Sequence, residues 1–413
     1  MLREKVLLPL HVFDGLPREV HVIFFARIMN NIGSFVQPLL VLILTQKIGM
    51  ASDRAGFIVT MQTLACAPGI IIAGKLADTI GRKPIILFSQ GMGAAAVMLC
   101  GLFAPSIITA YLLIVSSFFY SMSMPAFDAL VADITTPANR RAAFSLTYMG
   151  LNIGFAVGPV LGGLLFEHAL ALLFIGDSVT TCLATLLIMC FVSETSHRTR
   201  TETDANLPME RRVDESVFRL LLHRPILLRF AAISFLYYFV FSQWDFSLPL
   251  QTAALFGQRG AVVYGLLAGF NGLTVIGMTP LLTKCLARMQ PIDLIALGGL
   301  CYGISFILFG FLHPLPLLYV GVFIMTIGEI LVSVNSRTFI ADYSPASHRG
   351  RISSVLPIIT GAGYTISPVV TGRIIAASSL PVAWAVASCI GVTSAILMWK
   401  LRKHALRERH RPC

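Results

Sequence analysis

Charged residues occur inside the long apolar stretches of this chain, where a charge is costly. The five are Arg27, Asp128, Asp177, Asp245 and Glu329. A charge at the centre of a bilayer costs about 2.5–3.5 kcal/mol on insertion scales, so each needs a structural or functional reason. Because desolvation makes a carboxylate bind a proton more readily, we predict that Glu329, Asp245 and Asp128 exchange protons. Asp177 is predicted to be structural, and a static pair of Arg27 with Asp128 is the alternative for those two.

Uncharged polar residues share helix faces with these charges. Arg27, Asn30, Ser34 and Gln37 follow one another at helical spacing, which places them on one face. Arg27 would serve as a counter-charge or as an anchor for an anionic group. The full set that we predict to line a central cavity is Arg27, Asn30, Asn31, Ser34, Gln37, Ser117, Ser121, Tyr238, Gln243, Trp244 and Ser333.

The elements that carry these residues are predicted to be membrane-spanning helices. Apolar residues make up 56% of the 413 residues and charged residues 12%, whereas soluble domains carry about 25% charge. A hydrocarbon core about 30 Å thick needs about 20 apolar residues per helix, so the length allows twelve spans. The predicted helices are 20–45, 56–77, 85–103, 107–132, 142–166, 170–192, 227–250, 261–284, 292–312, 316–341, 352–376 and 380–402.

Charge distribution predicts the orientation and the division of the chain. With both termini in the cytoplasm, the inner segments hold 26 Lys and Arg and the outer segments hold four. The positive-inside rule therefore favours this topology, and the net charge of +11 reflects it rather than nucleic-acid binding. Segment 193–224 is long and polar. We predict a six-helix half at 1–192, a cytoplasmic linker at 193–224 and a second six-helix half at 225–413.

An internal repeat relates the two halves at a constant offset of 209 residues. The offset pairs Ala132 with Ala341, Asp133 with Asp342, Arg140 with Arg349, Ser145 with Ser354, Gly154 with Gly363, Pro159 with Pro368, Val160 with Val369 and Gly163 with Gly372. Such a repeat predicts two pseudo-symmetric halves with a substrate site at their interface. Asp133 with Arg140, and Asp342 with Arg349, are predicted to form cytoplasmic gate contacts.

The loop between the second and third helices carries a specific motif. It reads Gly74-Lys75-Leu76-Ala77-Asp78-Thr79-Ile80-Gly81-Arg82-Lys83-Pro84. This sequence resembles the signature loop of the major facilitator superfamily. The resemblance implies a gating role for Gly74, Asp78, Gly81 and Arg82. Thr79 departs from the pattern, because the family usually has a basic residue there.

The fifth helix contains a second motif, rich in glycine. Its residues are Gly154, Gly158, Pro159, Gly162 and Gly163, and small residues of this kind let helices approach closely. The run resembles the antiporter motif of the twelve-helix drug/proton antiporters. The resemblance implies an all-α integral membrane protein with twelve transmembrane helices in two pseudo-symmetric halves, the major facilitator fold, and export by proton antiport. The usual arginine of helix 4 is missing, however, and helix 1 carries Arg27 instead of an acid.

Other function classes leave weaker traces in the sequence. Zinc, nucleophile-elbow and Walker motifs of enzymes do not occur, and the eight cysteines show no paired spacing. We therefore expect no enzymatic activity, no metal and no cofactor, with protons as the coupling ion. A proton-coupled uptake symporter for a sugar, peptide or organic acid is the alternative. The expected partners are a small-molecule substrate and the lipid bilayer, without nucleic acid, for a monomer in a bacterial inner membrane.

Overall fold

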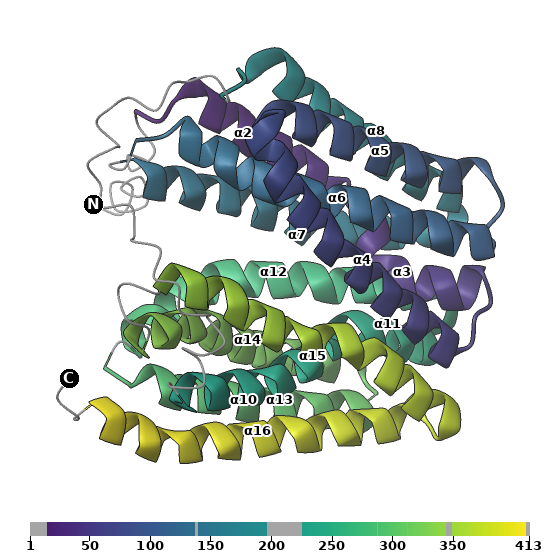
Figure 1. Cartoon of the computed structure of the whole chain (residues 1–413). Coiled ribbons are helices and arrows are strands. Elements are labelled where there is room, and N and C mark those ends of the chain that lie inside the picture. The colour runs from purple at the N-terminus through teal and green to yellow at the C-terminus, as the bar shows by residue number, and fades with distance from the viewer. Residues whose placement is uncertain are drawn as a thin grey trace, which may run out of the picture. The chain divides into compact units, whose positions relative to one another are not determined.

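The protein is helical throughout the described residues. The computed structural model describes residues 15–136, 139–195, 225–286, 288–311, 313–343 and 349–409, and these form helices and short connections (Figure 1). The predicted linker 193–224 lies mostly outside the described residues, so the division at 1–192, 193–224 and 225–413 stays a prediction.

Most helices begin and end within a few residues of the predicted bounds, but the helices that begin at Gln243 and Leu380 end six and seven residues beyond the predicted ends of their spans. In the first half they are α2 (Arg18–Ile32), α3 (Val36–Leu42), the π-helical turn η2 (Ile43–Lys47), α4 (Ser52–Thr79), α5 (Arg82–Leu102), α6 (Ile107–Asp133), α7 (Arg140–His168) and α8 (Leu170–Phe191). In the second half they are α10 (Pro225–Phe241), α11 (Gln243–Phe256), the 3-10 turn η4 (Gly257–Arg259), α12 (Gly260–Cys285), α13 (Pro291–Phe311), α14 (Leu315–Tyr343), α15 (Arg349–Ala377) and α16 (Leu380–Arg409).

Hydropathy assigns these helices to a membrane. Within the described residues, ten stretches are long and apolar enough to cross one. One of them, Pro225–Cys285, is 61 residues long and contains α10, α11 and α12, so it holds two spans. With α15, this gives the twelve transmembrane helices that the sequence predicts. Large apolar side chains such as Phe103 and Leu273, which are 67% and 64% exposed, fit an exterior surrounded by lipid.

Two of the twelve spans are interrupted, and the interruptions are related by the repeat. The first span breaks between α2 and α3, at Gly33 to Phe35, and the seventh breaks between α10 and α11, at Ser242. Gly33 and Ser242 are separated by the same offset of 209 residues. The symmetry read from other parts of the chain therefore extends to these breaks.

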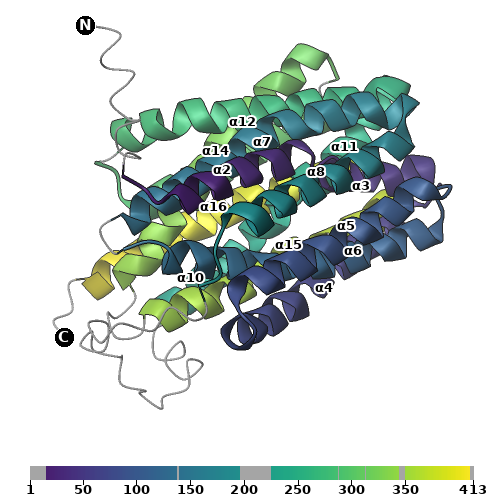
Figure 2. The same ribbon diagram turned by 90° about the horizontal axis from the view of Figure 1, so that it is seen from above.

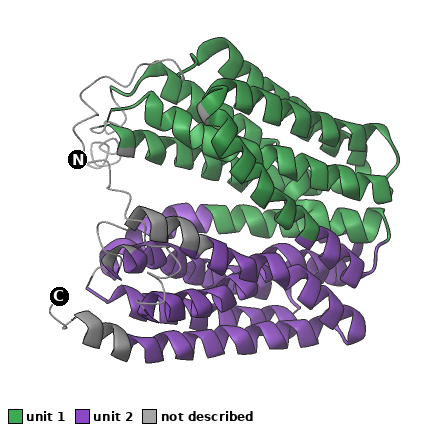
Figure 3. Ribbon diagram, in the orientation of Figure 1, with its two compact units in different colours: residues 1–49, 61–199, 261–272 green, residues 50–60, 200–260, 273–413 purple. Residues whose placement is uncertain are grey.

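The described chain divides into two compact units (Figure 3). Unit 1 consists of residues 1–49, 61–199 and 261–272, and unit 2 of residues 50–60, 200–260 and 273–413. Each unit thus takes a short piece from the other half of the sequence. Inside unit 1, α5 and α6 lie side by side in both views (Figures 1 and 2), and α2 packs on α7 and α8.

Glycines explain how the short pieces pack. In unit 1, Gly265 at the start of α12 lies so close to the carbonyl of Pro159 that no side chain fits there. In unit 2, Gly56 at the start of α4 lies equally close to the carbonyl of Pro368. The offset of 209 residues converts the first contact into the second. Each half therefore repeats the other's backbone contact, as expected for two pseudo-symmetric halves.

Candidate functional site

The break in the first span is held by Asp177 from α8. Its Oδ2 atom accepts hydrogen bonds from the backbone N–H groups of Phe35 and Val36, both at 3.1 Å. Asp177 is 6% exposed, so it provides a buried acceptor for donors at the start of α3, although the N–H group of Phe35 also donates to the carbonyl of Gly33 at 2.8 Å. On the other side of the break, Asn30 donates to the hydroxyl of Thr181 at 3.1 Å. These contacts give Asp177 the structural role predicted for it.

Arg27 and Asp128 form an unequal ion pair in unit 1. The Nη2 atom of Arg27 lies 3.8 Å from Oδ1 of Asp128, and the two side chains are 12% and 66% exposed, respectively. The guanidinium carbon lies 4.6 Å from the centroid of the Phe127 ring. Within the described part of the chain, the Nε atom of Arg27 is buried and lacks a hydrogen-bond partner. The two residues do meet, but the pair differs from a static buried one because its carboxylate is largely exposed.

A buried glutamine that the sequence analysis did not select links the first, second and fourth spans. Gln62 on α4 is 5% exposed, and its Nε2 atom donates to Oε1 of Gln37 at 3.1 Å and to Oγ of Ser117 at 2.7 Å. Gln37 is exposed, and the hydrogen bond from the buried Gln62 orients its amide group. Gln62 could have been found in the sequence, because it is a polar side chain inside an apolar span, as Gln37 is.

Other predicted cavity residues of unit 1 are used in packing. Ser121 is 7% exposed and donates to the carbonyls of Cys66 at 3.0 Å and Phe118 at 2.7 Å. Asn31 donates to the carbonyl of Arg27 at 3.0 Å, and Ser34 is half-buried in the break. Helix contacts therefore occupy the hydroxyl of Ser121 and the amide of Asn31.

In unit 2, the second break brings Asp245 to Tyr364. Asp245 lies in the first turn of α11, and the hydroxyl of Tyr364 on α15 donates to its Oδ2 atom at 2.6 Å. Asp245 is half-buried. A short hydrogen bond of this kind fixes the orientation of the carboxylate.

The neighbours of Asp245 hold α11 against α15. Gln243 and Trp244 are 1% and 3% exposed, although both are predicted to line the cavity. The Nε2 atom of Gln243 donates to Ser367 at 2.6 Å and to Thr371 at 3.0 Å. Its amide is therefore committed to packing in this conformation, because buried amides need their hydrogen bonds satisfied.

The remaining predicted residues of unit 2 are more accessible. Glu329 is half-buried in the middle of α14, next to Gly328, where a side chain would collide with α13 at the carbonyl of Gly298. Tyr238 is 39% exposed, and Ser333 is exposed one turn after Glu329. Their roles in proton exchange and substrate contact stay predictions.

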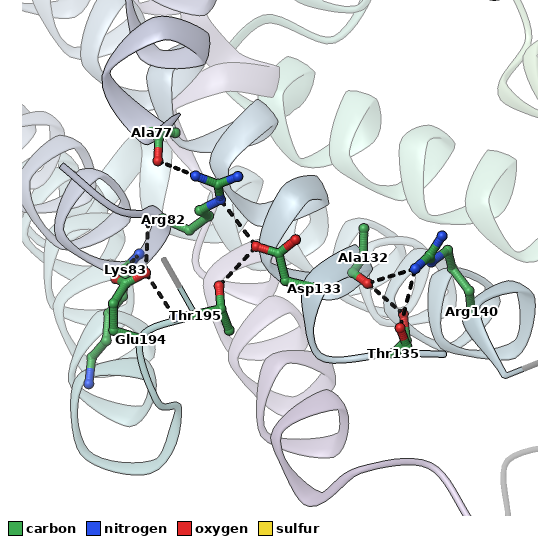
Figure 4. A network of polar contacts seen from close by, with 9 residues as sticks. All are labelled: Ala77, Arg82, Lys83, Ala132, Asp133, Thr135, Arg140, Glu194 and Thr195. Atoms are coloured by element: carbon green, nitrogen blue, oxygen red, sulfur yellow. Dashed lines mark hydrogen bonds and ion pairs between the residues drawn. The ribbon is translucent and has the colours of Figure 1, made fainter. Parts of the chain in front are cut away.

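A polar network at the N-terminus of α5 and the C-terminus of α6 differs from the predicted gate contacts (Figure 4). Asp133 accepts from Nε of Arg82 at 3.1 Å and from the hydroxyl of Thr195 at 3.0 Å. Arg140, its predicted partner, instead donates to the carbonyls of Ala132 at 3.1 Å and Thr135 at 3.3 Å. The contact of Asp133 therefore joins α5 and α6, and Arg140 donates to the C-terminal end of α6. The gating role of these residues stays a prediction.

Glu194 completes this network and was missed in the sequence. Its carboxylate accepts from the backbone N–H groups of Arg82 at 3.1 Å and Lys83 at 2.9 Å (Figure 4), so it caps the N-terminus of α5. Gly81 has a φ of 114°, and a Cβ there would lie 2.9 Å from the carboxyl carbon of Glu194. Gly81 is thus required for two reasons.

Some gating residues cannot be placed in this network. The side chains of Asp78, Asp342 and Arg349 lie outside the described residues, so their predicted contacts stay predictions. A Cβ on Gly74 would meet nothing within 4 Å. Gly74 is therefore not required by close packing in this conformation.

The second motif makes α7 approach two helices at once. Gly154 and Gly158 face the first span, where a Cβ on either glycine would collide with atoms of Asn31, at 2.6 Å in the case of Gly158, and a Cβ on Gly162 would lie a tight 3.3 Å from Phe35. On the other face, a Cβ on Gly163 would lie 2.6 Å from the carbonyl of Ala261 on α12. The motif is thus a two-sided packing surface of small residues.

Comparison with known proteins identifies the family. A family model described as Major Facilitator Superfamily matches residues 23–356 and 294–412, and the chain therefore belongs to this superfamily of membrane transporters. A Na(+), Li(+), K(+)/H(+) antiporter of Planococcus maritimus is 24% identical over 380 residues, which cover 86% of this chain and 87% of that one. A class H tetracycline resistance protein of Pasteurella multocida is 26% identical over 184 residues, covering 44% and 46%.

Solved structures of the same fold exist. A mutant of the peptide transporter POT in complex with sulfate matches with a TM-score of 0.78 at 17% sequence identity, covering 96% of both chains. This likeness concerns the fold. The chain is accordingly an all-α transporter with the major facilitator fold.

Proposed function

We propose that this transporter exports small organic molecules or drugs in exchange for protons. The observation that carries the proposal is the unequal pair of Arg27 and Asp128. The side chain of Asp128 is 66% exposed and lies 3.8 Å from the guanidinium. Protonation of Asp128 would therefore break only a weak ion pair with Arg27. A charge inside a span faces protein or water rather than lipid, which makes Asp128 a binding point for either a proton or a substrate.

Antiport follows if substrate and proton compete for the same carboxylates. Asp128, Asp245 and Glu329 are the proposed proton carriers, and no other cofactor is required. In such an antiporter, the side of the membrane to which the site opens changes only when the site holds a proton or a substrate. The internal repeat is consistent with alternating access by rocking of the two halves. The proposed setting is a bacterial inner membrane with both termini in the cytoplasm, and the proposed unit is a monomer.

The relatives support this direction at low identity. One is named as an antiporter that exchanges cations for protons, and another is named for tetracycline resistance. The two-sided glycine surface of α7 resembles the motif of the drug/proton antiporters. Together these features favour export over uptake.

The alternative is a proton-coupled uptake symporter for a sugar, peptide or organic acid. Its support is the buried Nε atom of Arg27, which has no partner within the described residues and suits an anionic cargo. In that case a proton on Asp128 would assist substrate binding instead of opposing it.

Efflux from cells tests the proposal. Cells that lack their major pumps would express the chain, be loaded with ethidium, and be followed with and without an uncoupler. We expect uncoupler-sensitive efflux that is lost in Asp128→Asn and Glu329→Gln and retained in Glu19→Gln, a control on the first turn of α2. Parent cells that lose ethidium no faster than cells with an empty vector would contradict export, and uptake of organic acids would then be measured.

A further inference from the structure

The pair of Arg27 and Asp128 closely resembles a second pair on the same span. Lys47 lies 3.6 Å from Glu167, and its Nζ atom lies 4.6 Å from the centroid of Phe166, the residue before that acid. Arg27 lies 4.6 Å from Phe127, the residue before Asp128. In the outer pair, Lys47 with Glu167, both side chains are mostly buried, at 23% and 18% exposed.

The inner pair, Arg27 with Asp128, is unequal. Arg27 is 12% exposed, whereas Asp128 is 66% exposed and 3.8 Å away, beyond hydrogen-bond distance. The buried Nε atom of Arg27 has no hydrogen-bond partner among the described residues. The guanidinium of Arg27 can donate two hydrogen bonds to one ligand carboxylate, which would satisfy donors that Asp128 leaves unused.

Charge balance narrows the kind of ligand. An anion alone would satisfy Arg27 but would lie beside the negative charge of Asp128. A cation alone would satisfy Asp128 but would leave Arg27 without a counter-charge in a poorly solvated place. A ligand with both charges provides each side chain with a new partner and keeps the net charge of the site at zero.

We infer that Arg27 and Asp128 recognise zwitterionic substrates, small molecules with an amine and a carboxylate a few bonds apart. The carboxylate binds the guanidinium over the Phe127 ring, and the ammonium group binds Asp128. Without substrate, Arg27 and Asp128 pair with each other; with substrate bound, each pairs with one charge of the substrate. This inference rests on the proposed function, because the ammonium group and the transported proton then compete for Asp128.

Matched probes test the inference on the purified full-length protein. The first set is tryptophan, its methyl ester and N-acetyltryptophan, which share one ring system and carry both charges, the positive charge and the negative charge, respectively. The second set is 4-(aminomethyl)benzoate with its methyl ester and its N-acetyl derivative. The measurement is the probe concentration that gives a half-maximal rise in Tm. We expect at least one zwitterion to act at a concentration about tenfold below both of its derivatives.

Two variants must change the preference in opposite directions. Arg27→Gln should favour the ester over the zwitterion, and Asp128→Asn should favour the N-acetyl derivative, by about tenfold each. Lys47→Gln, in the outer pair, should leave the order of the three probes unchanged. Because the readout is a ratio between probes, a general loss of stability does not produce it.

The outcomes separate this inference from the proposed function. It is overturned if neither zwitterion raises Tm, if an ester or N-acetyl probe binds as tightly as its zwitterion, or if both variants move the preference the same way. Ethidium efflux that is insensitive to uncoupler would overturn proton coupling while leaving the binding order intact. Uncoupler-sensitive efflux without a zwitterion preference would overturn only the inference.

Discussion

Two ion pairs on the first span use the same parts and differ in exposure. In each, a cation of the span lies over a phenylalanine and near the acid that follows it, Phe127–Asp128 for the inner pair and Phe166–Glu167 for the outer pair. The acid of the outer pair is 18% exposed and the acid of the inner pair is 66% exposed. An enclosed pair holds helices together, whereas an open one can exchange its partner.

The difference shows that the residue types alone do not define a transport site. A buried pair that loses one partner leaves an uncompensated charge, so it stays closed. An exposed carboxylate keeps access to water, protons and ligands. Asp177 accepts from Phe35 and Val36 at the break between the two pairs, and both pairs lie on the same span.

Neutralising either pair should separate the two roles most strongly. Asp128→Asn is expected to lower uncoupler-sensitive efflux of ethidium by about tenfold or more, because it removes the carboxylate proposed to bind both the proton and the cation, and a hydrogen bond to a charged group contributes ~1.5–3 kcal/mol. Glu167→Gln and Lys47→Gln should change efflux by less than about twofold. Efflux per molecule of protein in the membrane is the measurement.

Equal losses of efflux in Asp128→Asn and in the variants of the outer pair would show that the exposure of Asp128 has no functional meaning. Expression levels in the membrane provide the control, since a variant that fails to insert is not informative. The double variant Arg27→Asp with Asp128→Arg keeps the net charge but exchanges the places of the two charges. It shows whether efflux depends on the net charge or on where each charge lies.

Removal of the carboxylate between the pairs should affect stability rather than selectivity. Asp177→Ala removes the acceptor of the buried Val36 N–H group and one of the two acceptors of the Phe35 N–H group. A buried donor left unsatisfied costs about 1–3 kcal/mol, so this variant should lower Tm more than any variant of the outer pair. Asp177→Asn retains a carbonyl acceptor and should fall between Asp177→Ala and the parent. Thermal unfolding in detergent measures this order. If Asp177→Ala unfolds like the parent, the break does not depend on this carboxylate.

The sequence predicts the helices and their symmetry well because these depend on local composition. Runs of apolar residues fix the spans, and the offset of 209 residues found near Pro159 and Pro368 also relates the contacts of Gly265 and Gly56. Costly polar residues in apolar runs led to the ion pair of Arg27 with Asp128. These signals are read within single segments or between repeats.

Contacts between non-equivalent segments were not predictable in this way. Glu194 follows α8 but caps α5, and at the edge of a polar stretch it looks like a solvated residue. Asp133 has two basic candidates nearby, and only the structure shows that Arg82 rather than Arg140 contacts it. Gln243 and Gln37 are both glutamines inside apolar spans, yet Gln243 is buried and Gln37 is exposed. Such choices depend on which helices become neighbours.

A smaller effect is expected at the N-terminus of α5. Glu194→Gln keeps an acceptor for one N–H group of α5 but removes the negative charge, so stability should fall by about 1 kcal/mol. The zwitterion preference should not change, because Glu194 accepts from the backbone of Arg82 and Lys83 at the start of α5 and from that of Thr195. The Tm of the variant and its order of probes are measured together. A changed order would mean that this end of the unit contributes to recognition.

The smallest effect is expected from exchanging the two charges of the outer pair. The double variant Lys47→Glu with Glu167→Lys preserves an ion pair between two mostly buried side chains but loses the cation over Phe166, a contact that contributes about 0.5–2 kcal/mol. Tm should therefore fall only slightly, and efflux should match the parent. The single variant Lys47→Glu should be less stable than the double, because it places two acids together. If the double variant exports poorly although it is stable, the outer pair takes part in transport and the distinction based on exposure is wrong.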